Sequence, residues 1–251
     1  MVETKLVVAG ALAVPTLYFA SVLLRAIASV SLSEGWNHIL ANVWATSGLL
    51  DYVIGLLFAA PYFWLRAPSL PTKLVVVTGV CFLGNVFSVA VFIAYIVRGH
   101  GTLREALLPL RKASPPMDSA APSRLAFIVA ALASMVFFVG YCVYCVSVQP
   151  ISVGWAYIKA DTWSYVTVID VWTGICMVVT YVVVREFHDA KLFCSLLVVA
   201  LIFLGNGATC FYLLYLALVR FPRGSLRDIF LLNEHILTED APLKRPEVSL
   251  S

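Results

Sequence analysis

Six long apolar segments constrain this chain more than any other feature of its sequence. A helix that crosses a bilayer needs about 20 mostly apolar residues, because the hydrocarbon core is about 30 Å thick and each helical residue rises about 1.5 Å. Segments of this kind cover residues 6–30, 43–65, 74–97, 125–148, 163–184 and 192–219. Each is too long and too uniformly apolar for the amphipathic helix of a soluble protein. We therefore expect an all-α integral membrane protein with about six transmembrane helices, surrounded by the lipid bilayer.

Composition supports this class and excludes others. Charged residues make up 12% of the chain, about half the share of a typical soluble domain. A net charge of +3, without a basic run interleaved with aromatic residues, argues against a nucleic-acid partner. The six cysteines lie inside apolar segments, where they are typical of small buried residues, and this includes the pair Cys142 and Cys145. The four histidines show no metal-ligand spacing. We expect no cofactor and no metal.

An internal repeat is the strongest feature beyond hydropathy. The dipeptide Gly35-Trp36 recurs 119 residues later as Gly154-Trp155. The same offset relates three further pairs of identical residues: Trp44 and Trp163, Asp51 and Asp170, and Gly55 and Gly174. With small insertions, the tripeptide at 83–85 recurs at 204–206, and the segment 101–105 recurs in similar form at 224–228. The pattern indicates a duplicated unit of three helices followed by a basic amphipathic segment.

The repeat predicts how the chain is divided. Residues 1–98 form the first unit, 99–123 an amphipathic and proline-rich linker, 124–236 the second unit, and 237–251 a polar disordered tail. Three crossings are an odd number, so two directly joined units would point in opposite directions, as in the inverted repeats of many secondary transporters. With a cytoplasmic N-terminus, nine Lys and Arg residues would face the cytoplasm and seven the other side. This small bias fits an inverted duplication and assigns no orientation.

Two acidic residues lie well inside the predicted spans. A charged carboxylate in the bilayer costs several kcal/mol, so Asp51 and Asp170 are functional candidates. Asn85 and Asn206 fall near the middle of the third and sixth spans. If the units are inverted, one carboxylate lies above the membrane midplane and the other below it. We hypothesise a small-solute or ion transporter, with proton coupling as one form, whose path is lined by these four residues.

The same residues allow a second interpretation. Each aspartate would then be a structural hydrogen-bond partner, and the protein a non-catalytic membrane scaffold or assembly factor. Catalytic motifs such as G-x-S-x-G or a phosphate-binding loop are absent from the sequence, so we do not expect an enzyme. A lipid-modifying enzyme is the third and weakest interpretation. Four tryptophans have the positions expected at a membrane–water interface: Trp36, Trp44, Trp155 and Trp163.

The second half of the chain also carries a recognisable pattern. Residues 163–170 read Trp-Ser-Tyr-Val-Thr-Val-Ile-Asp, Arg185-Glu186 ends the same span, and Leu204-Gly205-Asn206 and Tyr212 follow. This pattern resembles an uncharacterised family of small multi-pass membrane proteins of plants and algae, a domain of unknown function. The first half departs from it, because Arg66-Ala67 stands where the second half has Arg-Glu. The resemblance implies a multi-pass fold, and it carries no functional residue over to this chain.

Overall fold

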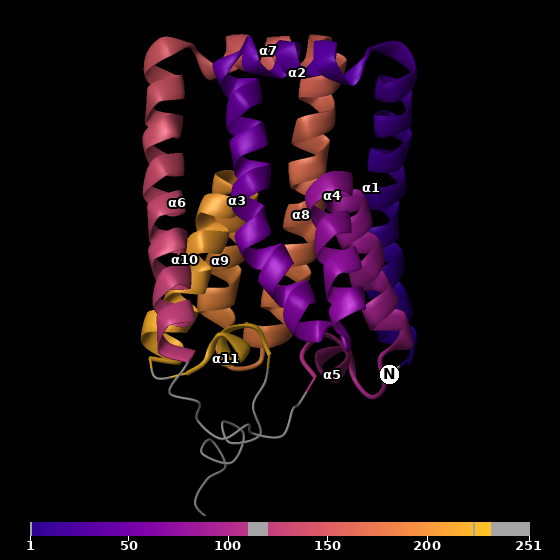
Figure 1. Cartoon of the computed structure of the whole chain (residues 1–251), viewed down its shortest axis with the longest axis vertical. Coiled ribbons are helices and arrows are strands. Elements are labelled where there is room, and N and C mark those ends of the chain that lie inside the picture. The colour runs from indigo at the N-terminus through magenta and orange to yellow at the C-terminus, as the bar shows by residue number, and fades with distance from the viewer. Residues whose placement is uncertain (1, 110–119, 223, 232–251) are drawn as a thin grey trace, which may run out of the picture.

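The computed structural model describes residues 2–109, 120–222 and 224–231, and every regular element in these residues is helical. Five of the helices are long and apolar enough to cross a membrane (Figure 1). They are α1 (Val2–Ser29), α3 (Val43–Arg66), α4 (Leu70–Arg98), α6 (Ala120–Val148) and α8 (Thr162–Glu186). The others are α2 (Leu32–Leu40), α5 (Leu103–Leu107), α7 (Ile151–Ala160), α9 (Lys191–Leu204), α10 (Asn206–Tyr215), the π-helical turn η1 (Leu216–Arg220) and α11 (Leu226–Phe230).

The long helices form a bundle whose two ends are each covered by short helices. In Figure 1, α1 and α3 run between the two ends and are joined at the top by α2, which lies across the bundle. Helices α6 and α8 are joined in the same way by α7, at the same end. Helices α5 and α11 cover the opposite end, where the N-terminus also lies. The sequence-equivalent helices α2 and α7 therefore share one end, and α5 and α11 share the other.

Helix α4 does not cross the bundle in one direction, because it is broken at Gly84. This glycine has φ 68° and ψ −157°, a combination open essentially to glycine alone. A Cβ added at Gly79 would meet the ring of Phe87, a contact that a straight helix does not allow between residues eight positions apart. The end of α4 returns to the N-terminal end of the bundle, where the Lys5 ammonium donates to the Gly99 carbonyl at 2.8 Å. Helix α4 is thus a re-entrant hairpin with its tip at Gly84.

Helices α9 and α10 form the equivalent hairpin in the second unit. Gly205, with φ 56° and ψ −138°, separates them. The rings of Phe193 in α9 and Tyr215 in α10 lie 4.6 Å apart, centroid to centroid. Nearer the hairpin base, Arg220 lies 3.7 Å from Asp189. Both limbs therefore run between one end of the bundle and its middle.

These hairpins correct three predictions from the sequence. The segments 74–97 and 192–219 were each expected to cross the membrane once, but each turns back at a glycine. A unit with two crossings and one re-entrant hairpin begins and ends on the same side, so the second unit has the same direction as the first. The six-span count and the inverted arrangement are therefore wrong. So is the placement of the aspartates on opposite sides of the midplane: each lies nine residues after the N-cap of its helix, Asn42 for α3 and Asp161 for α8.

Local signals in the sequence explain several helix ends. The Asn42 side chain accepts hydrogen bonds from the backbone N–H groups of Trp44 and Ala45 at the start of α3. Helices α5 and α11 each begin with a capping box, Thr102 with Glu105 and Ser225 with Asp228. Helix α6 begins at Ala120, inside the segment 99–123 that was assigned to the linker. The predicted tail at 237–251 lies outside the described residues.

The hydrophobic core lies towards the N-terminal end of the bundle, between the crossing helices and the hairpins. Its centre is aromatic: Phe58 and Tyr62 of α3 pack against Tyr181 of α8, with ring centroids 4.9 and 5.5 Å from that of Tyr181. A smaller cluster near α2 and α7 includes Phe19, Ile39 and Trp163. All six cysteines are free. Many large apolar side chains on α1 and α6 are exposed, as expected of surfaces that face lipid.

Candidate functional site

The structure places each predicted aspartate against the hairpin tip of the opposite unit. The Asp51 carboxylate accepts a hydrogen bond at Oδ1 from the backbone N–H of Asn206, at 2.7 Å. The Asn206 amide in turn donates from Nδ2 to the Asp51 backbone carbonyl at 3.0 Å. Thr209 completes the network by donating to the Asn206 amide oxygen, also at 3.0 Å. Asp51 is 6% exposed and Asn206 5%, so this contact is buried.

Asp170 and Asn85 repeat the same arrangement in reverse. The Asn85 N–H donates to Asp170 Oδ1 at 2.7 Å, and its side-chain Nδ2 donates to the Asp170 carbonyl at 2.9 Å. All four predicted polar residues therefore form hydrogen bonds with one another, but as two separate pairs. Each pair joins a crossing helix of one unit to the hairpin of the other.

The break in each hairpin explains why a carboxylate is found there. The first N–H groups of any helix have no partner within the helix, and a buried unpaired N–H inside a membrane costs several kcal/mol. Asn85 and Asn206 are the first residues after the breaks at Gly84 and Gly205, so their N–H groups need acceptors. A negative charge also interacts favourably with the positive end of the helix dipole. Each aspartate thus caps the N-terminus of a half-helix near the middle of the bundle.

Glycines make the close approach between the units possible. A Cβ at Gly84 would lie 2.9 Å from Asp170 Oδ2, and one at Gly205 would overlap Asp51 Oδ2. A Cβ at Gly55 or Gly174 would lie 2.8 or 2.6 Å from the amide nitrogen of the opposing asparagine. Any side chain at these positions would separate the carboxylate from the helix end that it caps.

The predicted interface tryptophans divide into two kinds. Trp44 packs against Gly154, and Trp163 packs against Gly35, so closely that a Cβ at either glycine would overlap the indole. Their Nε1–H groups donate across the units, Trp44 to the Gln149 carbonyl at 3.0 Å and Trp163 to the Val30 carbonyl at 3.2 Å. Trp36 and Trp155, on α2 and α7, are about half exposed. The first kind joins the units at their top end, and the second kind remains a candidate for contact with the membrane surface.

Sequence reasoning missed a second repeated contact at the opposite end of the bundle. Arg66 donates to the carbonyls of Ala106 and Leu107 in α5, both at 2.7 Å. Its equivalent, Arg185, is 3% exposed and donates to the carbonyls of Asp228 and Ile229 at α11. A tyrosine one turn earlier in each helix, Tyr62 or Tyr181, donates to the same short helices. The sequence does contain a signal for this contact, because the two tyrosines and the two arginines are each related by the offset of 119 residues.

A pair of polar residues also joins the two units at the top of the bundle. His38 Nδ1 in α2 lies 2.8 Å from Asp161 Oδ2 at the start of α8. Burial alone would raise the pKa of the Asp161 carboxyl, but hydrogen bonds from Ser164 and His38 outweigh this effect and hold the pKa below its ordinary value. This contact is a further connection between the two units.

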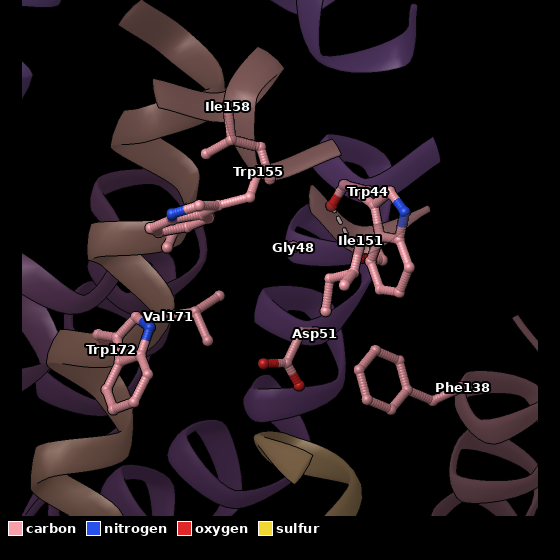
Figure 2. Close-up of a pocket in the computed structure, with 11 residues that line it drawn as sticks. Trp44, Gly48, Asp51, Phe138, Ile151, Trp155, Ile158, Val171 and Trp172 are labelled. Atoms are coloured by element: carbon pink, nitrogen blue, oxygen red, sulfur yellow. Dashed lines mark hydrogen bonds between the residues drawn. The ribbon is translucent and has the colours of Figure 1, made fainter. Parts of the chain in front are cut away.

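A cavity of about 200 Å³ lies next to Asp51 and not within either hairpin. Helices α3, α6, α7 and α8 supply its walls, and Figure 2 shows the Asp51 carboxylate between the side chains of Val171 and Phe138. Three tryptophans line the same cavity: Trp44, Trp155 and Trp172. Asp51 Oδ2 has no hydrogen-bond donor among the described residues, since Asn206 uses only Oδ1 and the backbone carbonyl. One acidic oxygen is therefore free beside an otherwise apolar space.

The equivalent wall beside Asp170 has a different composition. At the offset of 119, Tyr52 stands where the cavity has Val171, and Val53 stands where it has Trp172. The Tyr52 hydroxyl donates to the Val80 carbonyl at 2.9 Å, which holds this large ring against α4. Phe19, equivalent to Phe138, is buried in the cluster near α2 and α7. The two carboxylates thus share a capping role but not the same surroundings.

No family model, curated protein or solved structure matches this chain. Within the described residues, no three side chains of His, Cys, Asp and Glu gather as they would around a metal ion. The arrangement offers one carboxylate oxygen, three indole rings and apolar walls. This chemistry suits reversible binding of a small solute more than a bond-making reaction, which needs several convergent polar groups.

Proposed function

We propose that this polytopic membrane protein is a transporter of a small solute or ion, with Asp51 as the residue that meets the solute. The observation that carries the proposal is the free Oδ2 of Asp51, which borders a cavity while Oδ1 caps the hairpin tip at Asn206. Re-entrant half-helices are a recurring device of transporters, where their ends meet the solute near the bilayer midplane. Non-helical backbone at this depth is tolerated only where it is buried in protein or borders a water-filled cavity.

The double use of Asp51 suggests how movement could be coupled to binding. A solute or proton that engages the carboxylate competes with the N–H of Asn206 for its negative charge. Weakening this bond would loosen the hairpin of α9 and α10, whose tip has no other carboxylate cap in the described structure. Protonation during transport is one form of this competition, which makes proton coupling part of the proposal. Asn206 then belongs to the moving part of the path, whereas Asp170 and Asn85 hold the hairpin of α4 in place.

A flux assay with purified protein in lipid vesicles tests the proposal. The vesicles are mixed with hyperosmotic solutions of small polyols, amino acids, inorganic salts and organic ammonium salts, and the recovery of vesicle volume is followed by light scattering. We expect at least one class of solute to enter faster than into protein-free vesicles, and this gain to be lost in Asp51→Asn. If no class enters faster, transport by this protein is refuted.

A second candidate function rests on a separate observation. Two aspartate–asparagine pairs and two close tryptophan–glycine contacts join one unit to the other, which is also what a rigid membrane scaffold requires. On this alternative the protein holds a partner in the membrane, and Asp51 has no role beyond capping. Stable co-purification of one membrane protein in a fixed ratio, together with no flux for any solute, would favour it.

A further inference from the structure

The cavity beside Asp51 has the composition of a site for an organic cation. Among the residues that the structure describes, its only ionisable lining group is the Asp51 carboxylate, and no lysine, arginine or histidine lines it. Three indole rings also line it, from Trp44, Trp155 and Trp172. Among aromatic side chains, tryptophan attracts a cation over its ring face most strongly. Apart from the hydroxyl of Ser47, the remaining walls, including Phe138 and Val171, are apolar. The charge favours a positive ligand, and the walls favour one with apolar groups around its charge.

Two other classes of ligand fit less well. Hard metal cations such as Ca²⁺ take six to eight oxygen ligands, and the cavity offers the free Asp51 oxygen and the hydroxyl of Ser47, which already donates to the Trp44 carbonyl at 2.7 Å. An anion would meet a carboxylate without a compensating positive side chain. A quaternary ammonium group needs no hydrogen-bond acceptors and is recognised by cages of aromatic rings.

We propose that this cavity binds a small alkylammonium ion, with its charge between Asp51 and the indoles of Trp155 and Trp172. The inference rests on the proposed transport function only for its biological use, since binding can be measured without flux. Trp155 and Trp172 are each nearly half exposed, so they stand at the mouth of the cavity, and Asp51, 6% exposed, lies deeper. The ligand would pass the two indoles before it reaches the carboxylate.

The repeat supplies substitutions that the fold already accepts elsewhere. Val171→Tyr and Trp172→Val copy Tyr52 and Val53, the residues at the equivalent positions of the first unit. The first reduces the space beside Asp51, and the second removes one indole. Neither changes the carboxylate or the hairpin cap, so both should fold even if Asp51→Asn does not.

Matched tryptophans provide a control for general effects on the aromatic surface. Trp155 and Trp36 occupy equivalent positions on α7 and α2, and they are 45% and 49% exposed. Only Trp155 lines the cavity. A change to leucine at either position removes a half-exposed indole from a surface helix, but only Trp155→Leu removes a wall of the proposed site.

The experiment is calorimetric titration of the full chain in lipid nanodiscs with tetramethylammonium chloride, with sodium chloride of equal concentration as reference. We expect saturable binding by the wild type. Val171→Tyr, Trp172→Val and Trp155→Leu should each raise the Kd by about tenfold or more, as expected when a desolvated cation–π contact or the space for it is lost. Trp36→Leu and Asp170→Asn should leave the Kd within about threefold of the wild type.

Two results would overturn the inference. One is the absence of saturable binding by the wild type, and the other is binding that Val171→Tyr and Trp172→Val leave unchanged, which would place the site elsewhere. The outcome separates this inference from the transport proposal. Flux of an uncharged solute without tetramethylammonium binding would refute the cation site alone, whereas binding without flux of any solute would refute transport alone.

Discussion

Replacing Gly205 with alanine tests whether the hairpin tip and the Asp51 cap form one unit. Gly205 has φ 56° and ψ −138°, a backbone conformation that costs a residue with a side chain about 1–3 kcal/mol. The added Cβ would also overlap Asp51 Oδ2. The carboxylate must then move away from the Asn206 N–H, and a hydrogen bond to a charged group contributes about 1.5–3 kcal/mol. Together the two effects come to roughly 2.5–6 kcal/mol.

Thermal unfolding of the purified protein in detergent measures this loss. For a chain of this size, each kcal/mol corresponds to about 2–4 °C, so Gly205→Ala should lower the midpoint by roughly 5–24 °C. Gly84→Ala should behave alike, since its Cβ would lie 2.9 Å from Asp170 Oδ2. Gly140→Ala in α6 is the control, because nothing lies within 4 Å of its added Cβ. If Gly205→Ala is as stable as Gly140→Ala, the hairpin described here is wrong.

Three further predictions concern contacts between the units. Gly154→Ala should lower the unfolding midpoint by several degrees, because the added Cβ overlaps the indole of Trp44; a midpoint equal to that of the wild type would contradict this packing. Arg185→Gln should make α11 more accessible to protease than in the wild type, because the carbonyls of α11 lose the buried guanidinium that donates to them. Unchanged cleavage would show that Arg185 does not hold α11 in place. The pKa of Asp161 is lowered, so its stabilisation is present above the ordinary value of 3.8 and is lost as pH falls through the lower folded value. Between roughly pH 5 and pH 3 the midpoint should therefore fall more for the wild type than for Asp161→Asn, and parallel curves would exclude this role.

The sequence was sufficient for the class of the protein and for most crossing helices. The apolar segments of α1, α3, α6 and α8 differ from the observed helices by a few residues at most ends, because helix length in a bilayer is fixed by its thickness. The identities of the key polar residues were also visible, since Asp51, Asp170, Asn85 and Asn206 are repeated polar residues in apolar surroundings.

The hairpins could not be predicted by hydropathy alone. A re-entrant helix pair of two short limbs has the same length and apolar composition as one crossing helix, so a window average does not separate them. The distinguishing feature is the non-helical backbone conformation of one residue, Gly84 or Gly205. Glycine also occurs in ordinary crossing helices, as at Gly10 and Gly140. Once the hairpins were taken for crossings, the odd number of spans led directly to the wrong orientation of the second unit.

The cavity was not predictable for a different reason. Its lining includes positions at which the two units differ, among them Val171 and Trp172 against Tyr52 and Val53. A comparison of the two units that searches only for identical residues does not identify these positions. Which differences open a space depends on side-chain packing, and the sequence pattern carries no information about that.

The central claim is that the two equivalent carboxylates have different roles, with Asp51 both a cap and a binding residue and Asp170 a cap alone. The most direct test compares solute flux into vesicles containing Asp51→Asn with flux into vesicles containing Asp170→Asn, each normalised to the amount of folded protein. Asparagine keeps an acceptor oxygen for the hairpin N–H but not the charge. We expect flux to be lost in Asp51→Asn and retained in Asp170→Asn. Equal loss in both variants, or equal retention, would contradict it.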